Sequence, residues 1–112
     1  MSELFVLHAE ICKTLANPKR LEILNALQGG ELSVAELVRR LRLPKANVSQ
    51  HLAVLRSRGV VGARREGLNV YYRVANRKII RACNLMREVL MEYLDESARA
   101  TRNWGAVSRA AR

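Results

Sequence analysis

The hydrophobic periodicity of this sequence changes at Gly59, and that change constrains the fold more than any other feature. Before Gly59, apolar residues recur at helical spacing in four segments. After it, Val60-Val61 and the run from Val70 to Val74 have the composition and alternation of strands. A last segment is helical again, and Asn76 can cap its start. The order predicts an α+β fold that is mainly α, with about five helices and a β-hairpin.

Residues that favour helix boundaries separate the helical segments. Asn17-Pro18 restarts the chain after a first helix over Ser2 to Leu15, because Pro suits the first helical turn. Gly29-Gly30 ends the second helix. Ser33 and Glu36 have the Ser-x-x-Glu spacing of a capping box, which predicts the start of a short third helix.

The fourth helix, Lys45 to about Arg58, is predicted to present a polar face suited to reading bases. A helical wheel that turns Val48, Leu52 and Leu55 toward the core leaves other side chains facing outward. These outward residues are Ala46, Asn47, Gln50 and, at the margin, Ser49. Asn and Gln can pair bidentately with adenine, with about 1–3 kcal/mol of discrimination for each good pair. A solvated polar face without a partner is the alternative interpretation.

Basic residues around this helix and in the hairpin are suited to phosphate. Lys45 and Arg56 lie toward the two ends of the fourth helix. The hairpin is expected to carry a basic tip from Arg64 to Asn69, with Arg73 following, because arginine suits narrow, negatively charged grooves. A solvated hairpin is the alternative. The candidate DNA-binding residues are Lys45, Asn47, Ser49, Gln50, His51, Arg56, Arg64, Arg65, Asn69 and Arg73.

Two aromatic residues and one histidine in these segments have open roles. Tyr71 and Tyr72 alternate across their strand, so one is expected to pack inward and the other to present its hydroxyl to the DNA backbone. His51 lies near the core edge of the fourth helix. It is either a packed, hydrogen-bonded histidine or a phosphate contact.

The charge balance favours a polyanionic partner. The 112 residues contain 20 Lys and Arg against 10 Asp and Glu, for a formal net charge of +10. Aromatics are only 4%, which disfavours a reader of single strands, although a basic module that binds RNA or another protein remains an alternative. The sequence has neither a long apolar span nor a basic, apolar leader at its start, so we expect a cytoplasmic location and no membrane partner.

An enzyme is not expected. The two histidines, His8 and His51, lie on separate predicted helices without a nucleophile and a carboxylate arranged around either. The sequence also has no phosphate-binding glycine loop.

The last helix is expected to pair with another chain. An apolar stripe close to heptad spacing runs along it through Ile79, Cys83, Met86, Leu90 and Leu94. After Ser97 this rhythm fades into an Ala- and Arg-rich segment that contains Trp104. We therefore predict one winged-helix and dimerisation domain over residues 1–96 and a basic tail over residues 97–112, frayed or partly helical.

Four stretches, taken together and in order, closely resemble the ArsR/SmtB family of repressors. They are the run from Leu15 to Leu24, Glu31 to Leu37, Val48 to Arg56, and Arg65-Glu66-Gly67 with Val70 to Val74. The resemblance covers about Glu10 to Leu94 and implies a winged helix-turn-helix. It also implies a homodimer through the first and last helices that binds a palindromic duplex operator and leaves it when an inducer arrives.

The resemblance leaves the inducer open. Where the arsenic-sensing branch has a Cys-containing third helix, this chain has Ser33 and Ala35. Where the zinc-sensing branch places Asp and His ligands, the last helix here offers cations instead. Those cations are Arg77, Lys78, Arg81 and Arg87.

Cys12 and Cys83 remain as candidates for an inducer site, and they lie far apart without a CxxC motif, so a structural disulfide framework is not expected. Three interpretations compete. In the first, each cysteine is a small buried apolar residue. In the second, the two form a thiol switch that responds to oxidant or reactive sulfur. In the third, they bind arsenic(III) or a soft metal together with His8, which lies four residues before Cys12. We favour the switch over the metal site and expect no other cofactor.

Overall fold

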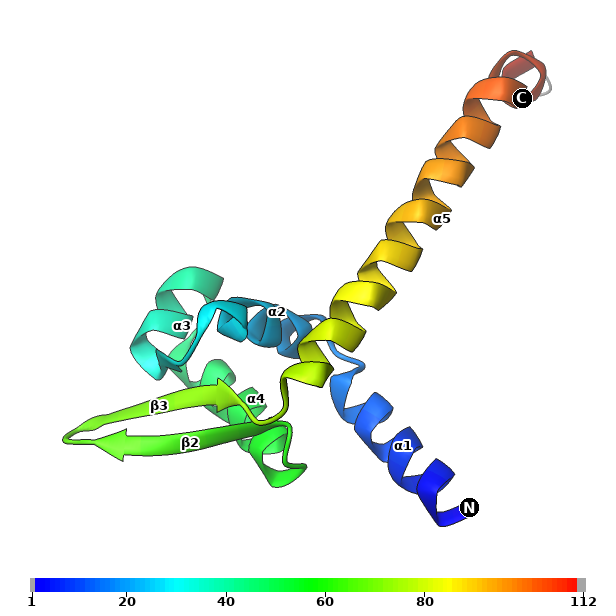
Figure 1. The fold of residues 1–112 in the computed structure, drawn as a ribbon. Helices are drawn as coiled ribbons and strands as arrows, with labels where there is room; N and C mark the ends of the chain where they lie inside the picture. The colour runs from blue at the N-terminus through cyan, green and yellow to red at the C-terminus, as the bar shows by residue number, and fades with distance from the viewer. Residues whose placement is uncertain (1, 111–112) are drawn as a thin grey trace. The chain divides into compact units, whose positions relative to one another are not determined.

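The computed structural model describes residues 2–110, with side chains described for residues 2–100. The elements follow the predicted order of helices, hairpin and final helix (Figure 1). They are α1 (Ser2–Leu15), α2 (Pro18–Ala26), the short 3-10 helix η1 (Leu27–Gly29), β1 (Leu32–Ser33), α3 (Val34–Leu41), α4 (Lys45–Ser57), β2 (Val61–Glu66), β3 (Asn69–Val74) and α5 (Arg77–Ala110). The described residues form two compact units that divide between Ile80 and Arg81.

The predicted start signals of α2, α3 and α5 are all confirmed. Asn17 Oδ1 accepts hydrogen bonds from the backbone N–H of Lys19 and of Arg20, at 2.9 and 3.2 Å. Asn76 Oδ1 accepts from the backbone N–H of Lys78 at 2.9 Å in the same way. These side chains satisfy backbone donors that have no partner inside the helix.

The capping box at α3 is complete. Ser33 Oγ accepts from the backbone N–H of Glu36 at 3.2 Å, and Glu36 Oε1 accepts from the backbone N–H of Ser33 at 3.0 Å. Hydrogen bonds from the backbone and then the side chain of Ser33 to the Glu36 carboxylate lower the pKa of Glu36. Loss of such a cap costs about 0.5–2 kcal/mol of stability, so this pair fixes where α3 begins.

The hairpin is part of a three-stranded antiparallel sheet with the order β1-β3-β2, and the sequence prediction missed the short strand β1. Leu32 pairs with Tyr72 and Ser33 pairs with Tyr71 across β1 and β3. Two residues are too few to show an alternating pattern, so this strand could be recognised only from its pairing with β3.

The prediction of a basic tip over Arg64 to Asn69 was wrong in its boundaries. The ladder between β2 and β3 continues to the pair Glu66 and Asn69, so the turn consists of Gly67 and Leu68 alone. Arg64 and Arg65 lie on β2 rather than in the turn. Charged side chains can occupy an exposed ladder because they extend into solvent while the backbone groups pair.

The core lies among α2, α3, α4 and the start of the hairpin. Its fully buried side chains are Ile23, Leu24, Leu27, Leu37, Val48, Leu52, Leu55 and Val60. Burial of each such side chain contributes roughly 1.5–3 kcal/mol. Three of the eight come from α4, so the core determines which face of α4 remains in solvent.

Apart from Ile80 in the first turn of α5, which is buried, the large apolar residues of α5 and those at the start of α1 do not join this core. Leu4, Phe5, Val6 and Leu7 on α1 are exposed, and so are Leu85, Met86, Leu90 and Leu94 on α5. Within the described residues, no helix is long and apolar enough to cross a membrane. Helix α5 continues through residue 97 without a break in its hydrogen-bonded backbone, and the side chain of Trp104 lies outside the described residues.

Candidate nucleic-acid interface

The polar face predicted for α4 is solvent-exposed. Val48, Leu52 and Leu55 have exposed fractions of 0%, and this burial turns the rest of the helix outward. The predicted residues that lie exposed on α4 are Lys45, Asn47, Ser49, Gln50 and Arg56. A single α-helix fits the major groove of B-DNA, so α4 has both the shape and the side chains to read base edges.

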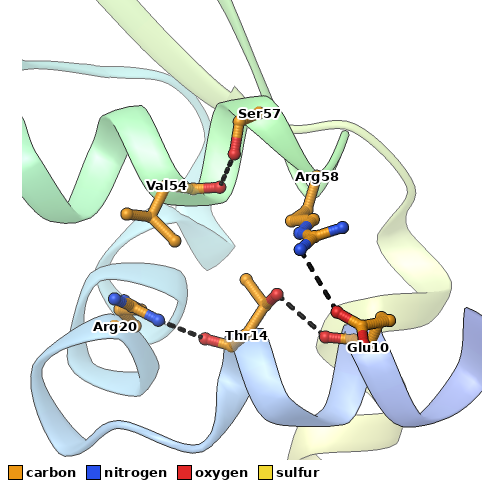
Figure 2. A network of polar contacts seen from close by, with 6 residues as sticks. All are labelled: Glu10, Thr14, Arg20, Val54, Ser57 and Arg58. Carbon is orange, nitrogen blue, oxygen red and sulfur yellow. Dashed lines mark hydrogen bonds and ion pairs between the residues drawn. The ribbon is translucent and has the colours of Figure 1, made fainter.

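A hydrogen-bonded network joins α4 to α1 and α2. Figure 2 shows Arg20 donating from Nη1 to the backbone oxygen of Thr14 at 3.1 Å, and Thr14 Oγ1 donating to the backbone oxygen of Glu10 at 2.9 Å. Glu10 in turn pairs with Arg58, directly after α4, at 3.2 Å between Oε2 and Nη2. Because this pair is about half exposed, it contributes at most about 1 kcal/mol.

His51 belongs to the same network. Its Nδ1 accepts a hydrogen bond from Arg20 Nε at 3.3 Å, and its side chain is half-buried. Burial lowers the pKa of His51 from 6.5, and the charge of Arg20 lowers it further. Of the two interpretations left open by the sequence, this geometry is that of a packed, hydrogen-bonded histidine, and a phosphate contact by His51 stays untested.

Arg64 is an exception among the predicted phosphate ligands, because its charge is already paired. Its Nε donates to Glu31 Oε1 at 2.7 Å, and its Nη1 forms an ion pair with Glu66. These bonds raise the pKa of Arg64 and lower that of Glu31. The guanidinium also lies over the ring of Tyr71, with 4.8 Å from Cζ to the ring centroid. Arg64 therefore braces the hairpin against the segment before β1.

The other predicted DNA-binding residues of the β2–β3 hairpin, called the wing from here on, are exposed. Arg65, Asn69 and Arg73 all lie on the strands with their side chains in solvent. Arg73 pairs across the ladder with Gly62, where an added Cβ would lie 3.0 Å from the guanidinium carbon. Glycine at this position thus leaves the space that the Arg73 side chain fills. Tyr71 and Tyr72 are both half-buried, and the assignment of one tyrosine inward and the other outward stays a prediction.

Two hollows link the helices to the wing. The first hollow has a volume of about 230 Å³ and is lined by Arg56 on α4 and Arg65 on β2. Lys45 at the start of α4 and Leu68 in the wing turn line another of about 470 Å³, together with Arg39 from α3. Arg39 is not among the DNA-binding residues predicted from the sequence. Its position on α3, two residues after the buried Leu37 and so turned away from the core, was the available signal.

The cysteines lie on different elements of the two units. Cys12 is exposed on α1, and Cys83 is half-buried on α5. His8 is exposed one turn before Cys12. Among the described residues, no group of three or more His, Cys, Asp or Glu side chains lies together in a way that could hold a metal ion. The thiol-switch and soft-metal interpretations both stay predictions.

Comparison with known proteins identifies the family. A model of bacterial regulatory proteins of the arsR family matches residues 17–62, which run from the cap of α2 to the start of β2. A helix-turn-helix transcriptional regulator of Mycobacterium tuberculosis is 42% identical over 94 residues, which span 83% of this chain and 82% of the relative. The chain belongs to the arsR family. It is a transcriptional regulator with a winged-helix DNA-binding fold, as the sequence resemblance predicted.

Solved structures and a further relative agree with this assignment. The crystal structure of the same M. tuberculosis regulator has a TM-score of 0.77 at 41% identity and covers 85% of this chain and 96% of that one. A homodimeric winged helix-turn-helix DNA-binding domain of Mycobacterium bovis has a TM-score of 0.77 at 36% identity, with 85% and 88% covered. A repressor named as an SmtB homolog in Synechocystis is 40% identical over 89 residues, and the match spans 80% of this chain but only 64% of that protein.

Proposed function

We propose that this protein is a homodimeric, cytoplasmic repressor that binds a palindromic duplex operator and has no catalytic activity. Helix α4 of each subunit enters the major groove, and the β2–β3 wing contacts the adjacent backbone and minor groove. The observation that carries the proposal is the exposed face of α4. Asn47 and Gln50 are exposed outside the face that Val48, Leu52 and Leu55 turn to the core, where they are free to meet base edges.

The charges around this face support the proposal. Arg56 and Arg65 border the same hollow between α4 and the wing, and the structure shows no ion pair for either within the described residues. A polyanion that follows this hollow meets two guanidinium groups with hydrogen-bond donors in a fixed fork. Arg64, by contrast, holds the wing in place through Glu31 and Glu66.

Selection of binding sites from a random duplex library, followed by a salt titration, tests this function. We expect a sequence with two-fold symmetry, because a two-fold dimer presents two copies of α4. Binding should weaken steeply with salt, since phosphate contacts displace counterions. Arg65→Ala should weaken binding to every duplex and reduce the salt slope by about 1.

Lys19→Ala is the matched control. It also removes one positive charge, but from the exposed start of α2, where Lys19 pairs with Glu22 at 3.1 Å. We expect it to leave the salt slope unchanged. A protein that enriches no duplex, or that binds with no dependence on salt, would instead support the alternative of a module that binds another protein.

For the inducer we propose a thiol switch at Cys12 and Cys83. Two thiols become one disulfide by losing two protons and two electrons to an oxidant such as hydrogen peroxide, which is reduced to two water molecules. The exposure of Cys12 on α1 supports the proposal, because an oxidant in solution can reach its sulfur. A disulfide between these helices would change the angle between the DNA-binding domains of the two subunits and so release the operator.

The switch is tested by operator affinity before and after peroxide, polysulfide and arsenite. We expect the first two to weaken binding, and Cys12→Ser or Cys83→Ser to abolish the response. A response to arsenite alone, lost in His8→Ala as well, would replace the switch with a soft-metal site. Unchanged affinity under all treatments would show that both cysteines serve packing only.

A further inference from the structure

The wing ends in a tight turn of two residues. Glu66 and Asn69 form the last pair of the ladder, and Gly67 and Leu68 connect them. Gly67 has a φ of +62°, and φ at Leu68 is not positive. A positive φ at the first central residue only, occupied by glycine, is typical of a type II′ turn, whose twist matches the two strands. Figure 1 shows this turn lying beyond the helices α3 and α4.

Leu68 is an apolar side chain at the extremity of a basic hairpin. Its exposed fraction is 102%, so its side chain lies fully in solvent, at the open edge of the hollow that it lines with Lys45 and Arg39. Within residues 2–100, every other exposed large apolar side chain lies on α1 or α5, the helices we expect at the dimer interface. Leu68 lies on neither helix, so pairing of those helices does not account for it.

The contacts of Arg64 stabilise the part of the hairpin next to the turn. Arg64, three residues before Gly67, pairs with Glu66 on its own strand and with Glu31 before β1. Its guanidinium also lies over Tyr71 on β3. These contacts tie β2 to β3 and to the segment before β1 within a few residues of the turn. A hairpin held by these contacts can keep its apolar tip in place when the tip binds another molecule.

We propose that Leu68 inserts into the minor groove beside each half-site and acts as a wedge between two base pairs. Apolar side chains such as Leu and Phe perform this function in proteins that partly unstack a base step and kink the duplex. The exposed cations of the wing, Arg65 and Arg73, hold the phosphates on either side of the groove. This inference rests on the proposed operator binding and adds a source of specificity to it.

The wedge makes the wing selective for deformable DNA rather than for a base edge. Pyrimidine–purine steps such as TA and CA unstack easily, whereas A-tracts are stiff. An operator flank with a TA step under the turn therefore binds more tightly than one with an A-tract at the same place. Asn47 and Gln50 on α4 contribute separately, through the major groove.

The test measures affinity, bending and unstacking on one selected operator. The bend is followed by energy transfer between dyes at the two duplex ends, and unstacking by the fluorescence of 2-aminopurine placed at the flank step. Leu68→Ala should weaken binding about tenfold, or about 1.4 kcal/mol, and remove the fluorescence increase. Leu68→Phe should restore both, because a larger apolar side chain also acts as a wedge.

The controls separate the wedge from the proposed function. The Leu68 side chain lies fully in solvent, so both variants should keep the thermal stability of the parent protein. Replacing the TA step with an A-tract should weaken the parent protein about tenfold, the same 1.4 kcal/mol, and leave Leu68→Ala unaffected. Tight, unbent binding that is the same for Leu68→Ala and the parent overturns the wedge alone. Failure of the parent protein to bind any duplex overturns the proposed function and the wedge together.

Discussion

Arg20 on α2 donates a hydrogen bond from Nε to Nδ1 of His51 on α4, over 3.3 Å. The two residues are 31 positions apart in the chain. The same guanidinium donates from Nη1 to the backbone oxygen of Thr14, near the end of α1. One side chain thus connects the first helix, the second helix and the helix that we propose reads DNA.

The bond between Arg20 and His51 predicts a dependence of stability on pH. Nδ1 must be unprotonated to accept it, and the pKa of His51 is lowered from 6.5 in the folded protein. The unfolded chain therefore binds the proton more readily. Stability should be fully present above about pH 6.5 and fall as the pH drops toward the folded-state pKa, by at most about 1.4 kcal/mol per pH unit.

Urea unfolding between pH 7 and pH 5 measures this effect. In the folded protein Glu31 and Glu36 titrate below this pH range, because the pKa of each carboxyl is lowered from 4.5. His51→Gln removes the titrating group and should flatten the dependence. If the variant keeps the slope of the parent protein, another group is responsible.

Glu31→Gln is expected to strengthen operator binding at low salt. The change removes one of the two carboxylates that pair with Arg64 and leaves that guanidinium more available to phosphate. The salt slope should become steeper by about 1. Glu22→Gln, which releases Lys19 on α2, is the matched control and should change neither quantity. An equal gain in both variants would indicate a general effect of net charge.

Gln50→Ala and Asn47→Ala should relax sequence preference rather than abolish binding. Each amide is exposed on α4 and can form two hydrogen bonds with one adenine. We expect loss of about 1–3 kcal/mol of discrimination at one base position per half-site, measured by competition with single-base operator variants. A uniform loss on every sequence would reassign these side chains to the backbone.

Leu90→Glu is expected to produce monomers with poor operator affinity. Leu90 is 51% exposed in the single chain and belongs to the apolar stripe of α5, so a dimer through α5 would bury the new carboxylate without a partner. We expect the dimer to weaken at least hundredfold, about 3 kcal/mol, in analytical ultracentrifugation. Arg81→Glu places the same side chain on the opposite face of α5 and should stay dimeric. A dimeric Leu90→Glu protein would contradict the placement of the interface.

The sequence predicted the helices and their caps well because their signals are local. Asn17, Ser33 with Glu36, and Asn76 each satisfy backbone donors within three residues, so the pattern and the structure carry the same information. The buried face of α4 was also predictable, since helical spacing alone places Val48, Leu52 and Leu55 together.

The sheet was predicted less well, because strand pairing is not local. Nothing within Leu32–Ser33 marks a strand, and the partners of these two residues lie 40 and 38 residues later in β3. The wing turn was placed too broadly for a related reason. A run of charged residues reads as a loop, whereas the ladder to Asn69 keeps Arg64, Arg65 and Glu66 in the strand.

By itself, the sequence determined the order of elements, the exposed face of α4 and the family, because periodicity, caps and motif order are properties of neighbouring residues. Only the tertiary structure decided which charged groups remain available. Arg64 is paired with Glu31, 33 positions away, and His51 accepts from Arg20, 31 positions away, while Arg65 extends into solvent. Such pairings depend on distances in space that chain spacing does not encode, because the core must first bring the helices and the hairpin together.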